Sequence, residues 1–188
     1  MKKRKYLSIA VMGTALIGAV MTAIPFLKSL SVSEARESAA WATCDVSKLD
    51  KGEVLTCGYA MIYYRTEEDK LSISKYTHLL EDPLSKISKQ PDRAINKWRS
   101  ENVNYFIFRP WAPIRRCSIE FHKEYEFWWE APENEALEAL PYFTELCEGR
   151  TWDMSGRLYQ RGRHPPEENL TVPNVKWISD TRVLVYGG

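Results

Sequence analysis

Four cysteines and three histidines are the side chains of this 188-residue chain that most readily bind metals or react. Glu145 and Glu148 flank Cys147, and His122 follows Cys117 at a short distance along the chain. Paired carboxylates can hold a cation or share a proton, so one interpretation of this group is a metal or acid–base site. The other is that these are solvated loop charges, and we favour it because that arrangement is more common.

Short motifs of the common catalytic sites are missing from the sequence. It contains no G-x-G-x-x-G, P-loop, H-E-x-x-H, C-x-x-C or G-x-S-x-G pattern. We expect His78 and His164 to be exposed or hydrogen-bonded rather than catalytic. The usual starting points for nucleotide, zinc-protease, thioredoxin and hydrolase chemistry are therefore absent.

The spacing of the cysteines allows disulfides. Cys44 and Cys57 flank a predicted hairpin, and they form either a bridge or two free buried thiols. Cys117 and Cys147 lie in two loop-rich stretches, Trp111–Lys123 and Phe143–Arg163. A bridge between them would stabilise the domain by about 3–4 kcal/mol in the chain-entropy model.

Many short apolar segments separated by turns predict a mainly β, antiparallel domain rather than βαβ units. A polar stretch from Ser72 to about Arg99 predicts a small helical insertion, with Asp92–Trp98 as its best helical turn. The predicted strands are Trp41–Val46, Val54–Gly58, Ala60–Arg65, Tyr105–Phe108, Leu158–Tyr159, Leu170–Val172, Lys176–Ile178 and Val183–Tyr186.

The N-terminal region has the pattern of a membrane anchor. A basic tail, residues 1–5, precedes an uncharged run, residues 6–27, that would form a helix of roughly 33 Å, enough to span a hydrocarbon core. A small, polar tether follows at residues 28–40. The alternative is a signal peptide cleaved near Ala35 or Ala39, but its apolar stretch is usually shorter. We expect a single-pass protein of the bacterial inner membrane with a cytoplasmic N-terminus. The domain, residues 41–188, would then lie in the periplasm, an oxidising compartment in which disulfides form.

The distribution of charge excludes one class of partner. The whole chain has a net charge of +1, but its first 40 residues carry +4 and the remaining 148 carry −3. A domain without cationic excess is a poor match for phosphates, so we expect no nucleic-acid partner. With 44% hydrophobic and 27% charged residues, the chain is neither disordered nor polytopic.

The order of these features resembles the Rieske iron–sulfur subunit of quinol–cytochrome c reductase. A basic patch, one membrane helix, a hinge and a β domain with two cysteine-bearing loops follow one another as in that family. The resemblance runs through most of the chain, and the segments that carry it are Asp45–Leu49 with Gly52, Gln90–Pro91, Trp98–Ser100, Tyr105–Phe108, Leu146–Arg157, Asn169–Pro173 and Asp180–Gly187.

The resemblance implies where a cluster would bind. The family holds its [2Fe–2S] cluster with two boxes, C-x-H-x-x-C and C-x-C-H, and joins the two remaining cysteines in a disulfide. Here the boxes fall within a tip at about residues 109–163. The disulfide positions are Cys117 and Cys147, whereas the four ligand positions are occupied by Ala112, Ile114, Glu145 and Glu148.

These replacements remove the expected cofactor. Alanine and isoleucine have no donor atom, and carboxylates are hard ligands where the cluster selects thiolates. Arg150 and Trp152 also occupy positions that hydrogen-bond the family's cluster. We expect a member of the family without a bound cofactor or metal and without catalysis by the chain itself.

Three functions remain open. The leading one is a membrane-anchored, cluster-free accessory subunit that packs with cytochrome b-type and cytochrome c-type subunits of a respiratory complex. The second is an electron-transferring iron–sulfur subunit with ligands elsewhere. The third is a free-standing periplasmic binding module that uses Trp128, Trp129 or the Glu145/Glu148 pair.

Overall fold

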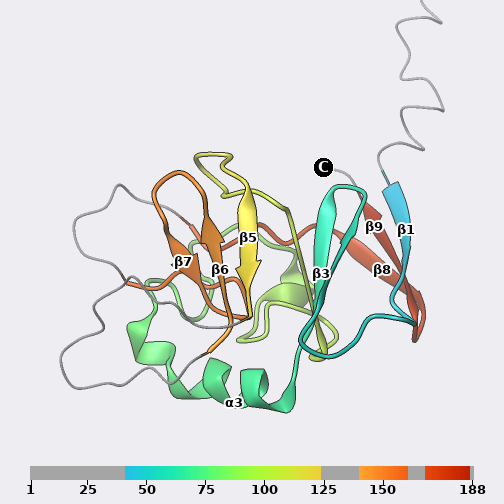
Figure 1. Ribbon diagram of the computed structural model, residues 1–188, viewed down its shortest axis with the longest axis horizontal. Coiled ribbons are helices and arrows are strands. Elements are labelled where there is room, and N and C mark those ends of the chain that lie inside the picture. Colours follow the sequence, from blue (N-terminus) through green and yellow to red (C-terminus); the bar gives the residue numbers. More distant parts are fainter. Residues whose placement is uncertain (1–40, 124–139, 161–167, 187–188) are drawn as a thin grey trace, which may run out of the picture. The chain divides into compact units, whose positions relative to one another are not determined.

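Three small antiparallel sheets make up the domain in the computed structural model, which describes residues 41–123, 140–160 and 168–186 (Figure 1). All these residues belong to one compact unit, Trp41–Gly188. The sheets have strand orders β1-β9-β8, β2-β3-β4 and β5-β6-β7. The strands are β1 (Trp41–Asp45), β2 (Val54–Cys57), β3 (Ala60–Tyr64), β4 (Tyr105–Phe108), β5 (Ile119–His122), β6 (Tyr142–Glu145), β7 (Thr151–Trp152), β8 (Val175–Ser179) and β9 (Arg182–Tyr186).

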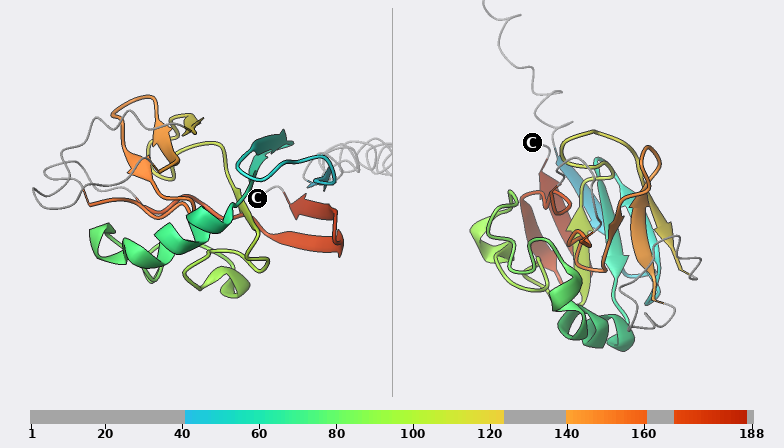
Figure 2. Two further views of the ribbon diagram at one scale, coloured as in Figure 1. Left: turned by 60° about the horizontal axis from the view of Figure 1, so that its bottom comes forward. Right: turned by 90° about the vertical axis from the view of Figure 1, so that its left-hand side faces the viewer.

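The sheet β2-β3-β4 lies between the other two, as both figures show (Figures 1 and 2). Strand side chains alternate between the two faces of a sheet. Tyr63, Phe106 and Phe108 pack in one cluster with the core residues of β5, β6 and β7. Ile62 and Ile107 pack in a second cluster with the core residues of β1, β8 and β9. Because both faces are buried, β3 and β4 consist almost entirely of apolar and aromatic residues.

Helical structure is limited to α3 (Glu67–Lys75) and the 3₁₀ turns η1 (Thr77–Leu79) and η2 (Asp92–Ala94). α3 begins with a capping box, in which the Thr66 hydroxyl accepts a hydrogen bond from the Asp69 N–H and the Asp69 carboxylate accepts one from the Thr66 N–H. The same carboxylate accepts the hydroxyl of Tyr63 at 2.8 Å. This contact ties the start of the helix to the middle of β3.

Three buried arginines bind the segment 153–157 to the rest of the domain. Arg65 donates to the carbonyl of Met154, and Arg99 donates to the carbonyls of Ser155 and Gly156. Arg157, inside the segment, donates to the Asp153 carboxylate and to the carbonyl of Ile73 at 2.6 Å. Burial lowers the pKa of Arg65 to about 10 and that of Arg99 to about 9, and the nearby carboxylate of Asp153 opposes both shifts. The guanidinium groups therefore stabilise the segment through many hydrogen bonds at the cost of desolvation.

The prediction of a mainly β, antiparallel domain with little helix is confirmed. Four details of the prediction were wrong. The hairpin predicted between Cys44 and Cys57 does not form, because β1 pairs with β9 and β2 pairs with β3. Leu158–Tyr159 forms only isolated bridges, and Leu170–Val172 is not a strand, although Leu170 and Val172 are core residues. In the stretch 72–99 the α-helix ends at Lys75, and only η2 remains of the predicted turn Asp92–Trp98.

The tip contains strands that the sequence did not predict. β5, β6 and β7 fall in the two stretches that were interpreted as loop-rich. These strands have only two to four residues each and include polar side chains, so they show no clear alternation of apolar and polar residues. Among the described residues, no helix is long and apolar enough to cross a membrane. The predicted anchor, residues 6–27, and its flanking tail and tether lie outside the described residues, as do Trp128 and Trp129.

Candidate functional site at the disulfide-linked tip

Two chain segments are joined at the tip by backbone pairing and a disulfide. Ile119 of β5 pairs with Glu145 of β6, and the Leu146 N–H donates to the carbonyl of Ser118 at 3.3 Å. Just beyond this end of the sheet, the disulfide Cys117–Cys147 links the two loops across a Cα–Cα distance of 6.1 Å. A second disulfide joins Cys44 of β1 to Cys57 of β2. All four cysteines of the chain are therefore bridged.

The four ligand positions inferred from the resemblance have different surroundings. Ala112 is fully buried in the core cluster, and its N–H donates to the carbonyl of Cys117 at 2.8 Å. Ile114 is 51% exposed. Glu145 is 1% exposed, and a carboxylate oxygen of it lies within 4.8 Å of both disulfide sulfurs. Glu148 is partly buried at the surface of the second loop.

A chain of ion pairs crosses the tip from one loop to the other. Nη1 of Arg115 in the first loop lies 2.6 Å from Oε1 of Glu148 in the second. The other oxygen of Glu148 accepts a hydrogen bond from Nη2 of Arg150 at 2.8 Å, and Nη1 of Arg150 lies 3.9 Å from the buried Glu145. Two arginines thus alternate with two glutamates from one loop to the other.

Comparison with known proteins agrees with the resemblance inferred from the sequence. The chain is 26% identical over 188 residues to the ubiquinol-cytochrome c reductase iron-sulfur subunit of Allochromatium vinosum, a match that covers 97% of this chain and 87% of the relative. The resemblance to the Rieske iron–sulfur subunit is confirmed. No family model matches the chain.

The tip does not fit the [2Fe–2S] cluster of a Rieske subunit. The sulfurs of Cys117 and Cys147 bond to each other, and those of Cys44 and Cys57 are bridged in another sheet. His122 lies at the end of β5 away from the disulfide, where it pairs with Tyr142 and stacks on its ring. Ala112 and Ile114 offer no donor atom, so the cluster's thiolates and imidazoles have no counterparts here.

Sequence reasoning assigned roles to the carboxylates of the tip but missed their cationic partner. The structure brings Cys117, Cys147, Glu145 and Glu148 together and does not bring His122 into the group. Arg115 was not singled out, although adjacent arginines at 115 and 116 precede the cysteine. Trp152, matched to a cluster-contacting position, is instead a fully buried core residue whose indole N–H donates to the carbonyl of Glu168 at 3.0 Å.

Proposed function

We propose that this protein is a cluster-free, membrane-anchored accessory subunit of a quinol–cytochrome c reductase or a related respiratory complex. The observation that carries the proposal is the combination of a Rieske-like chain with a tip in which ion pairs and a disulfide occupy the place of the cluster boxes. Such a subunit would act through its shape and contacts rather than through electron transfer.

The charge pattern of the tip supports a structural role. In an iron–sulfur protein, bonds to the metal ions hold the ligating loops. In this tip, Arg115 and Glu148 connect the same loops by a direct ion pair, and Arg150 extends the connection to Glu145. The second loop is also closed by hydrogen bonds between the backbones of Glu145 and Arg150 and of Gly149 and Glu145. Among the described residues, ion pairs, backbone hydrogen bonds and a disulfide thus connect the two loops of the tip.

Two further features support placement in the bacterial inner membrane with the domain in the periplasm. The basic tail and uncharged run at residues 1–27 have the pattern of an anchor with a cytoplasmic N-terminus. Two disulfides in one small domain are typical of an oxidising compartment. In this location the domain would meet cytochrome b-type and cytochrome c-type subunits.

Purification from native membranes tests the proposal. The full chain, with a C-terminal affinity tag, is isolated in mild detergent and its partners are identified by mass spectrometry and haem absorption. We expect cytochrome b-type and cytochrome c-type subunits in a fixed ratio to the tagged chain. Isolation without respiratory subunits would contradict the accessory role, and a cytochrome complex whose only Rieske-like protein is this one would favour electron transfer.

A further inference from the structure

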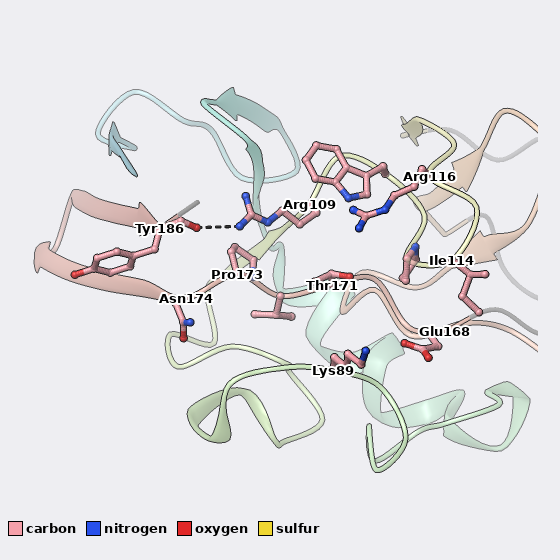
Figure 3. Close-up of a pocket in the computed structure, with 12 residues that line it drawn as sticks. Lys89, Arg109, Ile114, Arg116, Glu168, Thr171, Pro173, Asn174 and Tyr186 are labelled. Atoms are coloured by element: carbon pink, nitrogen blue, oxygen red, sulfur yellow. Dashed lines mark hydrogen bonds between the residues drawn. The ribbon is translucent and has the colours of Figure 1, made fainter. Parts of the chain in front are cut away.

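A cavity beside the first tip loop has a lining that neither disulfide nor ion-pair network explains. Its volume is about 440 Å³, within the range of small-molecule sites. It lies between that loop and the chain around residues 171–174, and it is visible in close-up in Figure 3.

Positive charge dominates the cavity wall. Among the described residues that line it, the charged ones are Lys89, Arg109, Arg116 and Glu168, three cations to one carboxylate. In Figure 3, Arg109 and Arg116 lie on the upper side of the cavity, and Lys89 and Glu168 on the lower side. This excess contrasts with the charge of −3 on residues 41–188.

The two arginines are held in place by different contacts. Arg109 is buried and donates to the backbone carbonyls of Tyr186 at 3.0 Å and Tyr59 at 3.3 Å. The guanidinium groups of Arg109 and Arg116 lie 6.0 and 5.8 Å from the ring centre of Trp111. Cation–π contact orients both groups but does not neutralise them.

Electrostatic repulsion between these cations is only partly offset by the carboxylate of Glu168 in the same wall. Among the described residues, no ion pair joins Lys89, Arg109 or Arg116 to a carboxylate. Burial lowers the pKa of Arg109, and the charge of Arg116 lowers it further. An anion in the cavity would therefore relieve an existing cost as well as form new hydrogen bonds.

We propose that this cavity binds a small organic phosphate. A guanidinium group can donate two parallel hydrogen bonds to two oxygens of a phosphate. The three cations and one carboxylate of the wall have a net charge of +2, which a phosphate monoester dianion neutralises. The walls also offer apolar surface from Pro113, Ile114 and Pro173, against which the organic part of the ligand packs. Pro113, Ile114 and Arg116 belong to the first box, but neither disulfide cysteine of the tip and none of the residues of its ion-pair chain lines the cavity. Ligand binding here is therefore independent of the accessory role proposed above.

Isothermal titration calorimetry of the full chain in detergent tests this site with phenyl phosphate, inorganic phosphate and phenol. We expect one phenyl phosphate per chain with a dissociation constant below about 1 mM, weaker binding of inorganic phosphate, and no heat from phenol. The R116Q variant should bind phenyl phosphate at least about tenfold more weakly, because one charge-assisted hydrogen bond is lost. K89Q should weaken binding in the same direction.

The matched control is R115Q, which removes the same charge from the adjacent residue, whose side chain pairs with Glu148 and does not line the cavity. R115Q should keep the affinity of the original protein within about twofold if the local site, not overall charge, binds the ligand. Circular dichroism verifies that each variant is folded. No binding of phenyl phosphate, equal affinity for inorganic phosphate, or equal losses in R115Q and R116Q would each overturn the proposal.

Discussion

At the tip, the carboxylate of Glu148 lies between the guanidinium groups of Arg115 and Arg150. All three side chains belong to loops that an iron–sulfur protein would hold through metal ligands. Since Arg115 and Glu148 are partly solvent-exposed, each pair contributes modestly and is weakened by salt.

The E148Q variant tests this network. It should lower the free energy of unfolding by about 1 kcal/mol at 50 mM NaCl, because two pairs are lost, and by less at 0.5 M NaCl. Urea unfolding followed by tryptophan fluorescence measures both values. E120Q is the control, because Glu120 lies on the neighbouring strand β5 and, among the described residues, pairs only with His122, at 3.8 Å. A loss for E120Q equal to that for E148Q would contradict the role of the network.

Tyr63 gives the protein a predictable response to alkaline pH. Burial raises the pKa of its hydroxyl. The Asp69 carboxylate raises this pKa further, because it is negatively charged and accepts a hydrogen bond from the hydroxyl, with 2.8 Å between the two oxygens. The folded state therefore keeps a proton that the unfolded state releases near pH 10, so this contribution to stability is complete below pH 10 and is lost above it.

Between pH 9 and 11 the original protein should therefore lose about 1.4 kcal/mol more stability than Y63F, which has no hydroxyl to ionise. Urea unfolding at the two pH values gives this difference directly. The comparison uses the change with pH within each protein, so the lower stability of Y63F at neutral pH does not affect it. Parallel losses in the two proteins would show that Tyr63 does not cause the alkaline response.

At the scale of elements, the two disulfides close loops of different length. Cys117 and Cys147 are 30 residues apart, and Cys44 and Cys57 are 13 apart. The entropy of loop closure then gives about 3.6 kcal/mol for the first bridge and about 2.9 kcal/mol for the second. Replacing each pair by alanine and measuring urea unfolding should reproduce this order.

Hydrogen exchange locates the effect of each replacement. The C117A/C147A variant should expose amides of β5 and β6 to faster exchange while those of β1 and β9 keep their protection. An equal loss of protection in both sheets would contradict this expectation that the tip opens separately from the rest of the domain.

The segment 153–157 depends on one glycine. Gly156 has a φ of +67°, and a Cβ at this position would overlap the ring of Phe106 in the core. G156A should destabilise the domain by about 3 kcal/mol or more through strain and overpacking. Gly52 also has a positive φ, of +81°, but a Cβ there would meet only the Thr66 methyl at 3.4 Å, so G52A should cost about 1 kcal/mol. Thermal unfolding of both variants measures these losses of stability. Equal losses for G156A and G52A would contradict the importance of the close approach of Gly156 to Phe106.

These elements also show how far sequence reasoning extends. β3 and β4 were predictable because their faces are both apolar. The turn residues around Gly52 suggested a hairpin of Trp41–Val46 with Val54–Gly58, but β1 pairs with β9 and β2 pairs with β3, and no local pattern reveals those partners. β5 was missed because Glu120 and His122 alternate with only two apolar residues, and because its partner strand β6 lies about 20 residues further along the chain. The start of α3 was missed although Thr66 and Asp69 carried the pattern of a capping box.

The candidate site was predictable only in part, for the same reason. The positions of Ala112, Ile114, Glu145 and Glu148 followed from the resemblance to Rieske subunits. The ion pair of Arg115 with Glu148 spans 33 positions along the chain and depends on how the two loops meet in the fold. The cavity near Trp111 likewise combines residues from distant segments, which no local pattern reveals.

At the scale of the whole molecule, we propose that this Rieske-like chain is stable without the Rieske cofactor. Three sheets share two apolar cores, buried arginines fix the segment 153–157, and ion pairs and a disulfide close the tip. The protein would then be folded and competent for assembly as soon as its disulfides form.

The most direct measurement is the iron content of the full chain, purified under anaerobic conditions and after incubation with iron and sulfide, together with its visible and paramagnetic resonance spectra. The iron–sulfur subunit of Allochromatium vinosum, treated in parallel, is the positive control. We predict less than about 0.1 iron atom per chain and no Rieske-type signal, since none of the four ligand positions holds a cysteine or a histidine. About two iron atoms per chain with a Rieske-type signal after reduction would contradict the account.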